Sequence, residues 1–203
     1  PERGIGVHRC SPGGGGPLVG VMRGRGTDGG ATATALSVAK ALKKNAGLGK
    51  GAPAVVVNRL LIRTTAGITK AVDDGTPVEV ADAARRPLGL PMPPFVLLQL
   101  VGPAVGLHVT EVLNAAFGDR FPVSENLKAL VAAKKPGVYD WTADGKPYVS
   151  EETTALLRFG DRPSTADQLR IQVEDALAEE IGLMLREGVV AAPMDIDLCL
   201  ILG

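Results

Sequence analysis

Glycine is distributed unevenly along this 203-residue chain, and the distribution limits what the first quarter can fold into. Residues 1–51 contain 14 of the 26 glycines, four of them consecutive at positions 13–16. The first aromatic residue is Phe95, so the glycine-rich part lacks the side chains that bury the most apolar area. We therefore expect residues 1–51 to form a unit whose own core is weak.

The composition excludes several classes of protein. The 22 Lys and Arg residues balance the 22 Asp and Glu residues, so no field of one sign would attract nucleic acid or an anionic membrane. Hydrophobic residues make up 45% of the chain, which is too much for a disordered protein. Cys10 and Cys199 lack the closely spaced Cys or His partners of a metal site, which favours a reducing, cytoplasmic compartment and no bound metal.

The first part of the chain is predicted to contain two strands and a helix. The strands are expected at residues 4–8 and 18–22, separated by a turn rich in Gly and Pro. Thr27 and Asp28 can cap a helix at residues 31–44, whose apolar residues recur on one face. Two strands and a helix in this order are typical of the edge of an α/β unit.

Residues 24–29 also have the spacing G-x-G-x-x-G, which can hold a pyrophosphate on backbone amides at a helix N-terminus. The glycine-rich surroundings make a chance match easy. The next acid after Asp28 is Asp73, far beyond the position about twenty residues on where a dinucleotide site needs a carboxylate. A phosphate site here is therefore the less favoured interpretation.

Beyond Pro53 the apolar residues recur at helical spacing. Thr76-Pro77-Val78-Glu79 and Thr165-Ala166-Asp167-Gln168 have the form of capping boxes. The uncharged stretch 87–110 is long enough to span a bilayer, but its prolines would break such a helix, so we expect it to be buried core. The predicted helices are 56–72, 77–86, 94–101, 103–117, 124–133 and 165–188, with an irregular connector at 134–163.

The two histidines are the candidates for a general base near neutral pH. His108 lies among apolar residues of a predicted core helix, where hydrogen-bonded packing is favoured over chemistry. His8 ends a short strand before a turn, a position from which a side chain can reach a cleft. Asn58 lies one turn into an apolar helix, which is typical of a buried polar residue bonded to backbone.

Several stretches look familiar when taken together. They are Gly6-Val7-His8, Ser11-Pro12, Pro17-Leu18-Val19, Lys40-Ala41-Leu42-Lys43-Lys44, Val57-Asn58-Arg59-Leu60-Leu61, Pro87-Leu88-Gly89-Leu90-Pro91-Met92 and Pro94-Phe95. With them, nearly the whole chain resembles the 3-hydroxyacyl-CoA dehydrogenases. The later stretches Glu179-Glu180-Ile181, Glu187-Gly188-Val189 and Asp195-Ile196-Asp197 are similar to the start of the duplicated C-terminal domain of multifunctional fatty-acid oxidation proteins.

The resemblance implies a mainly α fold in three parts. Residues 1–51 would be a remnant α/β edge of a Rossmann domain, residues 52–135 a helical C-terminal domain of 3-hydroxyacyl-CoA dehydrogenase type, and residues 136–203 a connector and a truncated second helical domain. The implied reaction oxidises 3-hydroxyacyl-CoA to 3-oxoacyl-CoA in fatty-acid β-oxidation, with NAD as cofactor. The implied partners are an acyl-CoA substrate and a second copy or a longer relative, without nucleic acid or a membrane span.

The resemblance also assigns roles to single residues. His8 matches the catalytic His that takes the proton from the 3-hydroxyl group, and Asn58 matches an Asn near the reacting carbon. Ser11 stands where the family has another Asn and is assigned with Asn58 to substrate binding. Gly20, however, stands where the family's L-V-E-V pattern places the Glu that orients the His.

These departures predict an impaired enzyme. Loss of an orienting carboxylate costs about 10² to 10⁴ in rate, by analogy with serine-protease triads. The chain begins at Pro1 without Met, and the family's NAD-binding strands would precede that point, so we expect little NAD binding and a chance match at residues 24–29. The alternatives are a non-catalytic helical module that dimerises or docks, and a degraded fragment of the family.

Overall fold

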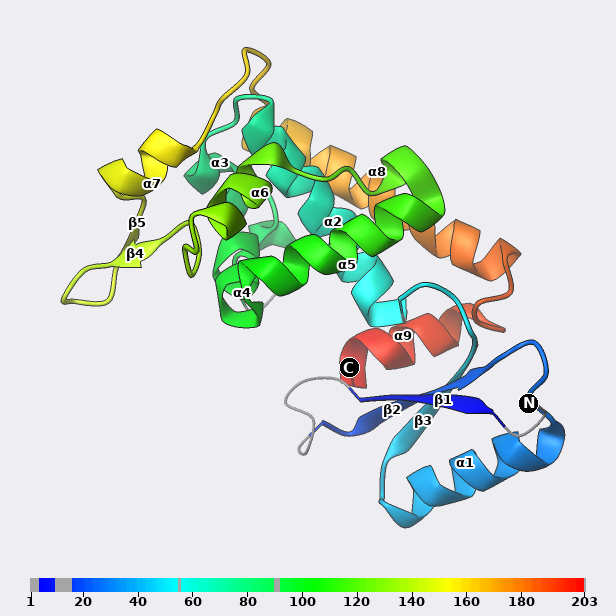
Figure 1. The fold of residues 1–203 in the computed structure, drawn as a ribbon. Coiled ribbons are helices and arrows are strands. Elements are labelled where there is room, and N and C mark those ends of the chain that lie inside the picture. The colour runs from blue at the N-terminus through cyan, green and yellow to red at the C-terminus, as the bar shows by residue number, and fades with distance from the viewer. Residues whose placement is uncertain (1–3, 10–15, 55, 90–91, 203) are drawn as a thin grey trace. The chain divides into compact units, whose positions relative to one another are not determined.

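The computed structural model describes residues 4–9, 16–54, 56–89 and 92–202, apart from the side chains of Arg9 and Leu88. The chain divides into two compact units. Unit 1 consists of Pro1–Leu60 and Ala178–Gly203, and unit 2 consists of Leu61–Leu177. Helices α2 (Val56–Asp73) and α8 (Ala166–Arg186) each contribute residues to both units (Figure 1).

Unit 1 is built on a three-stranded sheet with the order β1-β2-β3. Strands β1 (Ile5–Arg9) and β2 (Leu18–Arg23) are antiparallel, while β2 and β3 (Asn45–Lys50) are parallel and joined through α1 (Gly29–Ala41). The predicted strands and helix are confirmed. Strand β3 was not predicted, because its sequence Asn-Ala-Gly-Leu-Gly-Lys has little β propensity and owes its conformation to pairing with β2.

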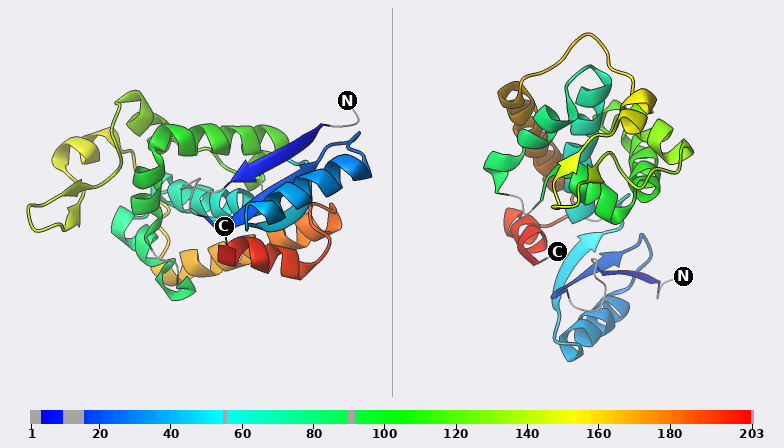
Figure 2. Two further views of the ribbon diagram at one scale, coloured as in Figure 1. Left: turned by 90° about the horizontal axis from the view of Figure 1, so that it is seen from below. Right: turned by 90° about the vertical axis from the view of Figure 1, so that its left-hand side faces the viewer.

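Different helices cover the two faces of this sheet, as Figures 1 and 2 show. Val19 and Val21 lie on the α1 face and are almost fully buried. The alternate residues of β2 point to the other face, where α9 (Pro193–Leu202) packs on β3.

The glycines of β3 allow this close packing. A Cβ at Gly47 would lie 3.2 Å from Sγ of Cys199, and one at Gly49 would lie 3.2 Å from the carbonyl oxygen of Val189. Lys50 donates its backbone N–H to that same carbonyl at 3.0 Å. Glycine in this strand therefore serves the contact with α9 and its preceding turn.

Unit 2 is mainly helical. Its core is formed by side chains from most of its helices, including Ile68 and Val72 of α2 and Leu169 and Val173 of α8. The elements that lie wholly within it are α3 (Val78–Ala83), the 3-10 turn η1 (Arg86–Leu88), α4 (Pro94–Val101), α5 (Pro103–Phe117), the 3-10 turn η2 (Gly118–Arg120), α6 (Glu125–Ala132), the hairpin β4 (Asp140–Trp141) with β5 (Pro147–Tyr148), and α7 (Glu151–Leu156).

The two predicted capping boxes have different outcomes. Thr165 and Gln168 exchange hydrogen bonds at the start of α8, where Gln168 N donates to Thr165 Oγ1 at 3.2 Å and Thr165 N donates to Gln168 Oε1 at 2.9 Å. This box is confirmed. The box at Thr76 is wrong, because α3 begins after Pro77 without a side-chain cap and Thr76 Oγ1 instead accepts the backbone N–H of Ser164 at 2.9 Å.

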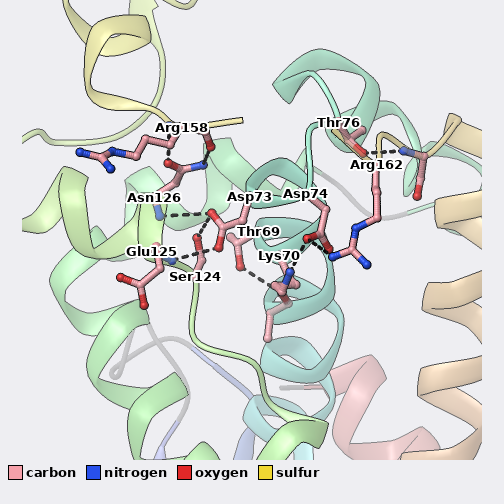
Figure 3. A network of polar contacts seen from close by, with 12 residues as sticks. Thr69, Lys70, Asp73, Asp74, Thr76, Ser124, Glu125, Asn126, Arg158 and Arg162 are labelled. Carbon is pink, nitrogen blue, oxygen red and sulfur yellow. Dashed lines mark hydrogen bonds and ion pairs between the residues drawn. The ribbon is translucent and has the colours of Figure 1, made fainter. Parts of the chain in front are cut away.

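Asp73, at the end of α2, holds the start of α6 (Figure 3). Its carboxylate accepts Ser124 Oγ–H at 2.9 Å and the backbone N–H groups of Glu125 and Asn126 at 2.9 and 3.1 Å. The Asn126 side chain in turn bonds both the N–H and the carbonyl of Arg158. Ser124 is the predicted N-cap of α6 and is confirmed as such by the Leu127 N–H that it accepts.

The uncharged stretch is only partly buried. Phe95 and Leu98 are core residues, but Leu100 and Val105 are 72% and 52% exposed, and His108 is also exposed rather than packed in a core. Helices α4 and α5 meet at Gly102, whose φ is +98°. Within the described ranges no single helix is long and apolar enough to cross a membrane; α4 and Pro103–Arg120 meet the criteria only as a pair bent by 101°.

Candidate functional site

His8 lies on β1 directly opposite Gly20 of β2. Alternation along the strands places the His8 side chain on the sheet face that α9 covers, and its side chain is half-buried there. Residues directly opposite in an antiparallel pair have their Cβ atoms about 5 Å apart. A side chain at position 20 would therefore lie next to the imidazole, and glycine supplies none.

A cavity of about 30 Å³ lies on this face of unit 1. Its floor is the sheet, with Gly20, Gly47 and Gly49, and its polar groups come from His8, Lys50, Asp195 and Cys199. The remaining lining side chains are apolar and include Val56 and Val57 of α2 and Val189 and Val190 of the turn before α9.

Asp195 supplies the one carboxylate among the described residues that line this cavity. Its Oδ2 atom accepts the backbone N–H groups of Ala191 and Ala192 at 3.2 and 2.9 Å, which holds the carboxylate at the start of α9. Within the described part of the chain, no group of three or more His, Cys, Asp or Glu side chains could hold a metal ion.

Of the other two predicted site residues, Asn58 is described by the structure and Ser11 is not. Asn58 lies in the first turn of α2, next to Val56 and Val57 of the cavity wall, with a half-buried side chain. Ser11 lies outside the described residues. The structure thus places His8 and Asn58 in the same unit, on the strand and the helix that border one cavity.

Arg59, which follows Asn58, was missed by the sequence analysis as a functional candidate. Its side chain is fully buried, and its guanidinium pairs with Glu180 at 2.5 Å and with Glu187 at 2.9 Å. The available signal was an Arg between Val56 and Leu60 on the apolar side of a helix, since a buried Arg requires an acidic partner.

The G-x-G-x-x-G segment does not fit a pyrophosphate. Asp28 caps α1, and its Oδ1 atom accepts the backbone N–H of Ala31 at 2.6 Å. A carboxylate thus occupies the helix N-terminus where a phosphate would bind, and its charge would repel that phosphate. This geometry agrees with the expectation of a chance match at residues 24–29.

A second polar cluster lies in unit 2. Asp82 accepts the Tyr139 hydroxyl at 2.6 Å and the Phe95 N–H at 3.0 Å. Burial raises the pKa of the Asp82 carboxyl above its usual value, against the opposing effect of these hydrogen bonds. Burial also lowers the pKa of Arg85 to about 10. The cluster joins α3, the start of α4 and the chain before β4, which is a structural arrangement.

The fold and the site define an α/β-plus-helical protein with a candidate general base, His8, beside a cavity on its sheet. Residues 55–140 match the family model described as 3-hydroxyacyl-CoA dehydrogenase, C-terminal domain. We therefore assign residues 55–140 by similarity to the C-terminal domain of this family.

Individual relatives agree with this assignment. The fatty acid oxidation complex subunit alpha of Acinetobacter baylyi is 27% identical over 219 residues, which cover 100% of this chain and 30% of that protein. The fold is similar to that of 3-hydroxybutyryl-CoA dehydrogenase from Escherichia coli (TM-score 0.78, 19% identity, covering 100% of this chain and 61% of that one). It is also similar to FadB2 of M. tuberculosis (TM-score 0.61, 26% identity, 66% and 48% covered). The chain therefore spans about a third of the length of the curated relatives it matches.

Proposed function

We propose that the chain acts as a 3-hydroxyacyl-CoA dehydrogenase of fatty-acid oxidation. This enzyme converts 3-hydroxyacyl-CoA to 3-oxoacyl-CoA. The observation that carries this proposal is His8, a general-base candidate that borders a cavity in a chain whose residues 55–140 match the family model. Its imidazole takes the proton of the 3-hydroxyl group. Asn58, which follows Val57 of the cavity wall, donates a side-chain N–H to the substrate oxygen, and the resemblance assigns Ser11 to substrate binding as well.

NAD, the cofactor of the family, supplies the hydride acceptor for such an oxidation. Because the helix N-terminus at Asp28 is already capped by a carboxylate, we assign no residue of the G-x-G-x-x-G segment to NAD. We expect the chain to consist of three parts: an α/β part at 1–51 with His8, a helical part at 52–135, and a connector with a further helical part at 136–203.

The proton-transfer step is proposed to be slow. Gly20 offers no carboxylate opposite His8, so nothing from β2 orients the imidazole or stabilises its charged form. A weak activity that depends on His8 is the expected result, and vigorous turnover would contradict the impairment.

The direct experiment compares the chain with His8→Gln and Asn58→Ala. NADH formation from 3-hydroxybutyryl-CoA is measured spectrophotometrically, and binding of acetoacetyl-CoA by calorimetry. We expect a low rate that His8→Gln abolishes and a binding affinity that Asn58→Ala weakens. Activity and binding that are indifferent to both substitutions would overturn the proposal.

We also propose that the chain forms a homodimer or associates with a longer relative through α4 and α5. Leu100, Val101, Val105 and Val112 are all at least 45% exposed on these two helices, which is a large apolar surface for an isolated chain. We also propose a cytoplasmic location from the sequence, because two cysteines near opposite ends of the chain are typical of a protein from a reducing compartment.

A further inference from the structure

Arg59 and two glutamates form a buried ion cluster within unit 1. The Nε atom of Arg59 donates to Glu180 Oε1 at 2.5 Å, and its Nη2 atom donates to Glu187 Oε2 at 2.9 Å. Arg59 and Glu180 are fully buried, whereas the Glu187 side chain is 38% exposed. Glu180 lies on α8, and Glu187 directly follows the last residue of that helix, with its backbone N–H bonded to the carbonyl of Leu183. Their separation of seven residues corresponds to two helical turns, so both carboxylates lie on the same side.

This cluster joins two segments that supply walls of the His8 cavity. On one side, Arg59 lies three residues after Val56, and Val56 and Val57 line the cavity. On the other side, Glu187 lies two residues before Val189, and Val189 and Val190 line it as well. We call these four residues the cavity valines. The Arg59 guanidinium thus connects the two walls and sets the distance between them.

We propose that Arg59, Glu180 and Glu187 act as a clamp that positions Asn58 and the cavity valines around the substrate. The inference rests on the proposed function only in assigning Asn58 to the substrate. All three members are positioning residues, because they contact each other and not the reacting atoms. An Arg suits this role because its planar fork bonds two carboxylates in fixed directions, which the single ammonium group of a Lys does not.

The variants Glu187→Gln and Arg59→Lys test the clamp. Gln still accepts a hydrogen bond but carries no charge, and Lys keeps the charge but loses the fork. Glu174→Gln is the matched control, because Glu174 lies on the same helix as Glu180, pairs with Arg170 at 2.8 Å in a half-buried pair, and is not among the residues that line the cavity. If Arg59→Lys does not fold, Glu187→Gln decides, since the Glu187 side chain is partly exposed.

The first readout is NMR of the valine methyl groups and the Asn58 side-chain amide, which requires no activity. We expect both clamp variants to move the signals of Asn58 and of the cavity valines, while Glu174→Gln leaves them in place. The clamp is overturned if the variants lower Tm but their Asn58 and valine signals superimpose on those of the unaltered chain. That result would show that the cluster stabilises the fold without positioning Asn58 or the cavity valines.

The second readout is the affinity for acetoacetyl-CoA, which should fall on the order of fivefold in the clamp variants because a small displacement of a positioning group is costly. The control should bind as the unaltered chain does. If no version of the chain binds acetoacetyl-CoA while the NMR signals move as expected, the clamp stands and the proposed function fails. If binding occurs and is equal in all versions, the clamp is overturned and the proposed function remains.

Discussion

Gly20 supplies no side chain opposite His8, so a carboxylate placed there addresses the proposed chemistry directly. We expect Gly20→Glu to raise the rate of NADH formation from 3-hydroxybutyryl-CoA by about 10² to 10⁴, because the carboxylate would orient the imidazole and stabilise its charged form. Gly20→Gln has nearly the same shape without the charge and is the control. Equal rates for the two variants would show that His8 gains nothing from a carboxylate at this position.

Asp82 gives a prediction of pH dependence. Its pKa in the folded chain is raised above 3.8, chiefly by burial, so the folded state holds the proton more tightly than the unfolded state. Its contribution to the free energy of unfolding is therefore complete below pH 3.8 and is lost as the pH rises through the raised pKa.

Urea unfolding of the chain and of Asp82→Asn across this pH range checks the prediction. The stability of the unaltered chain relative to the variant should fall with rising pH, by at most about 1.4 kcal/mol per pH unit for one proton. Parallel stability curves for the two proteins would mean that Asp82 does not titrate in this range.

Single residues were predictable where their type or a matching motif identified them. His8 and Asn58 were proposed in this way; His8 lines the cavity, Asn58 follows Val57 of the cavity wall, and their roles stay predictions. Arg59 and Asp195 were not identified as site candidates, because their significance depends on packing: Arg59 is bonded to residues more than 120 positions away, and Asp195 reaches the cavity only through the packing of α9 on β3. The spacing of residues along the sequence does not indicate such long-range contacts.

At the scale of elements, Asp73 is the connection between α2 and α6 that is easiest to test. We expect Asp73→Ala to lower the free energy of unfolding by about 1–3 kcal/mol, because it leaves the first N–H groups of α6 without their acceptor. Asp74→Ala is the neighbouring control, since Asp74 makes partly exposed ion pairs with Lys70 and Arg162 and should cost less than about 1 kcal/mol. Urea unfolding measures both; a larger loss at Asp74 would contradict this view of the network.

Most helices were predicted, but α7 lies within the stretch expected to be an irregular connector, and α9 was not predicted. The box at Thr165 formed because its partner, Gln168, lies within one turn and nothing competes for it. The hydroxyl of Thr76 was taken by Ser164, a residue from another segment of unit 2. Strand β3 was missed for the same reason, because its conformation depends on β2 and on the close packing of α9, and not on its own side chains.

On the scale of the whole molecule, the glycine-rich start of the chain shares one compact unit with the C-terminal residues. Its residues form unit 1 together with Ala178–Gly203, and Gly47 and Gly49 give α9 and its preceding turn their close approach to β3. The weak core expected for residues 1–51 is thus completed by the other end of the chain. The composition led us to expect a weak core in residues 1–51, but it could not identify the segment that packs against them.

The exposed apolar side chains of α4 and α5 predict that two copies of the chain associate through these helices. A self-complementary apolar surface on two joined helices favours a symmetric dimer, because each copy buries what the other exposes. We expect light scattering coupled to size exclusion to give twice the mass of the chain, and Val105→Asp to give the single mass, because a carboxylate buried in that interface would lack a partner. Ile171→Asp, at a 50% exposed position of α8, is the matched control and should leave the dimer intact. A monomer before any substitution would refute the dimer, and dissociation by both substitutions would place the interface elsewhere than on α4 and α5.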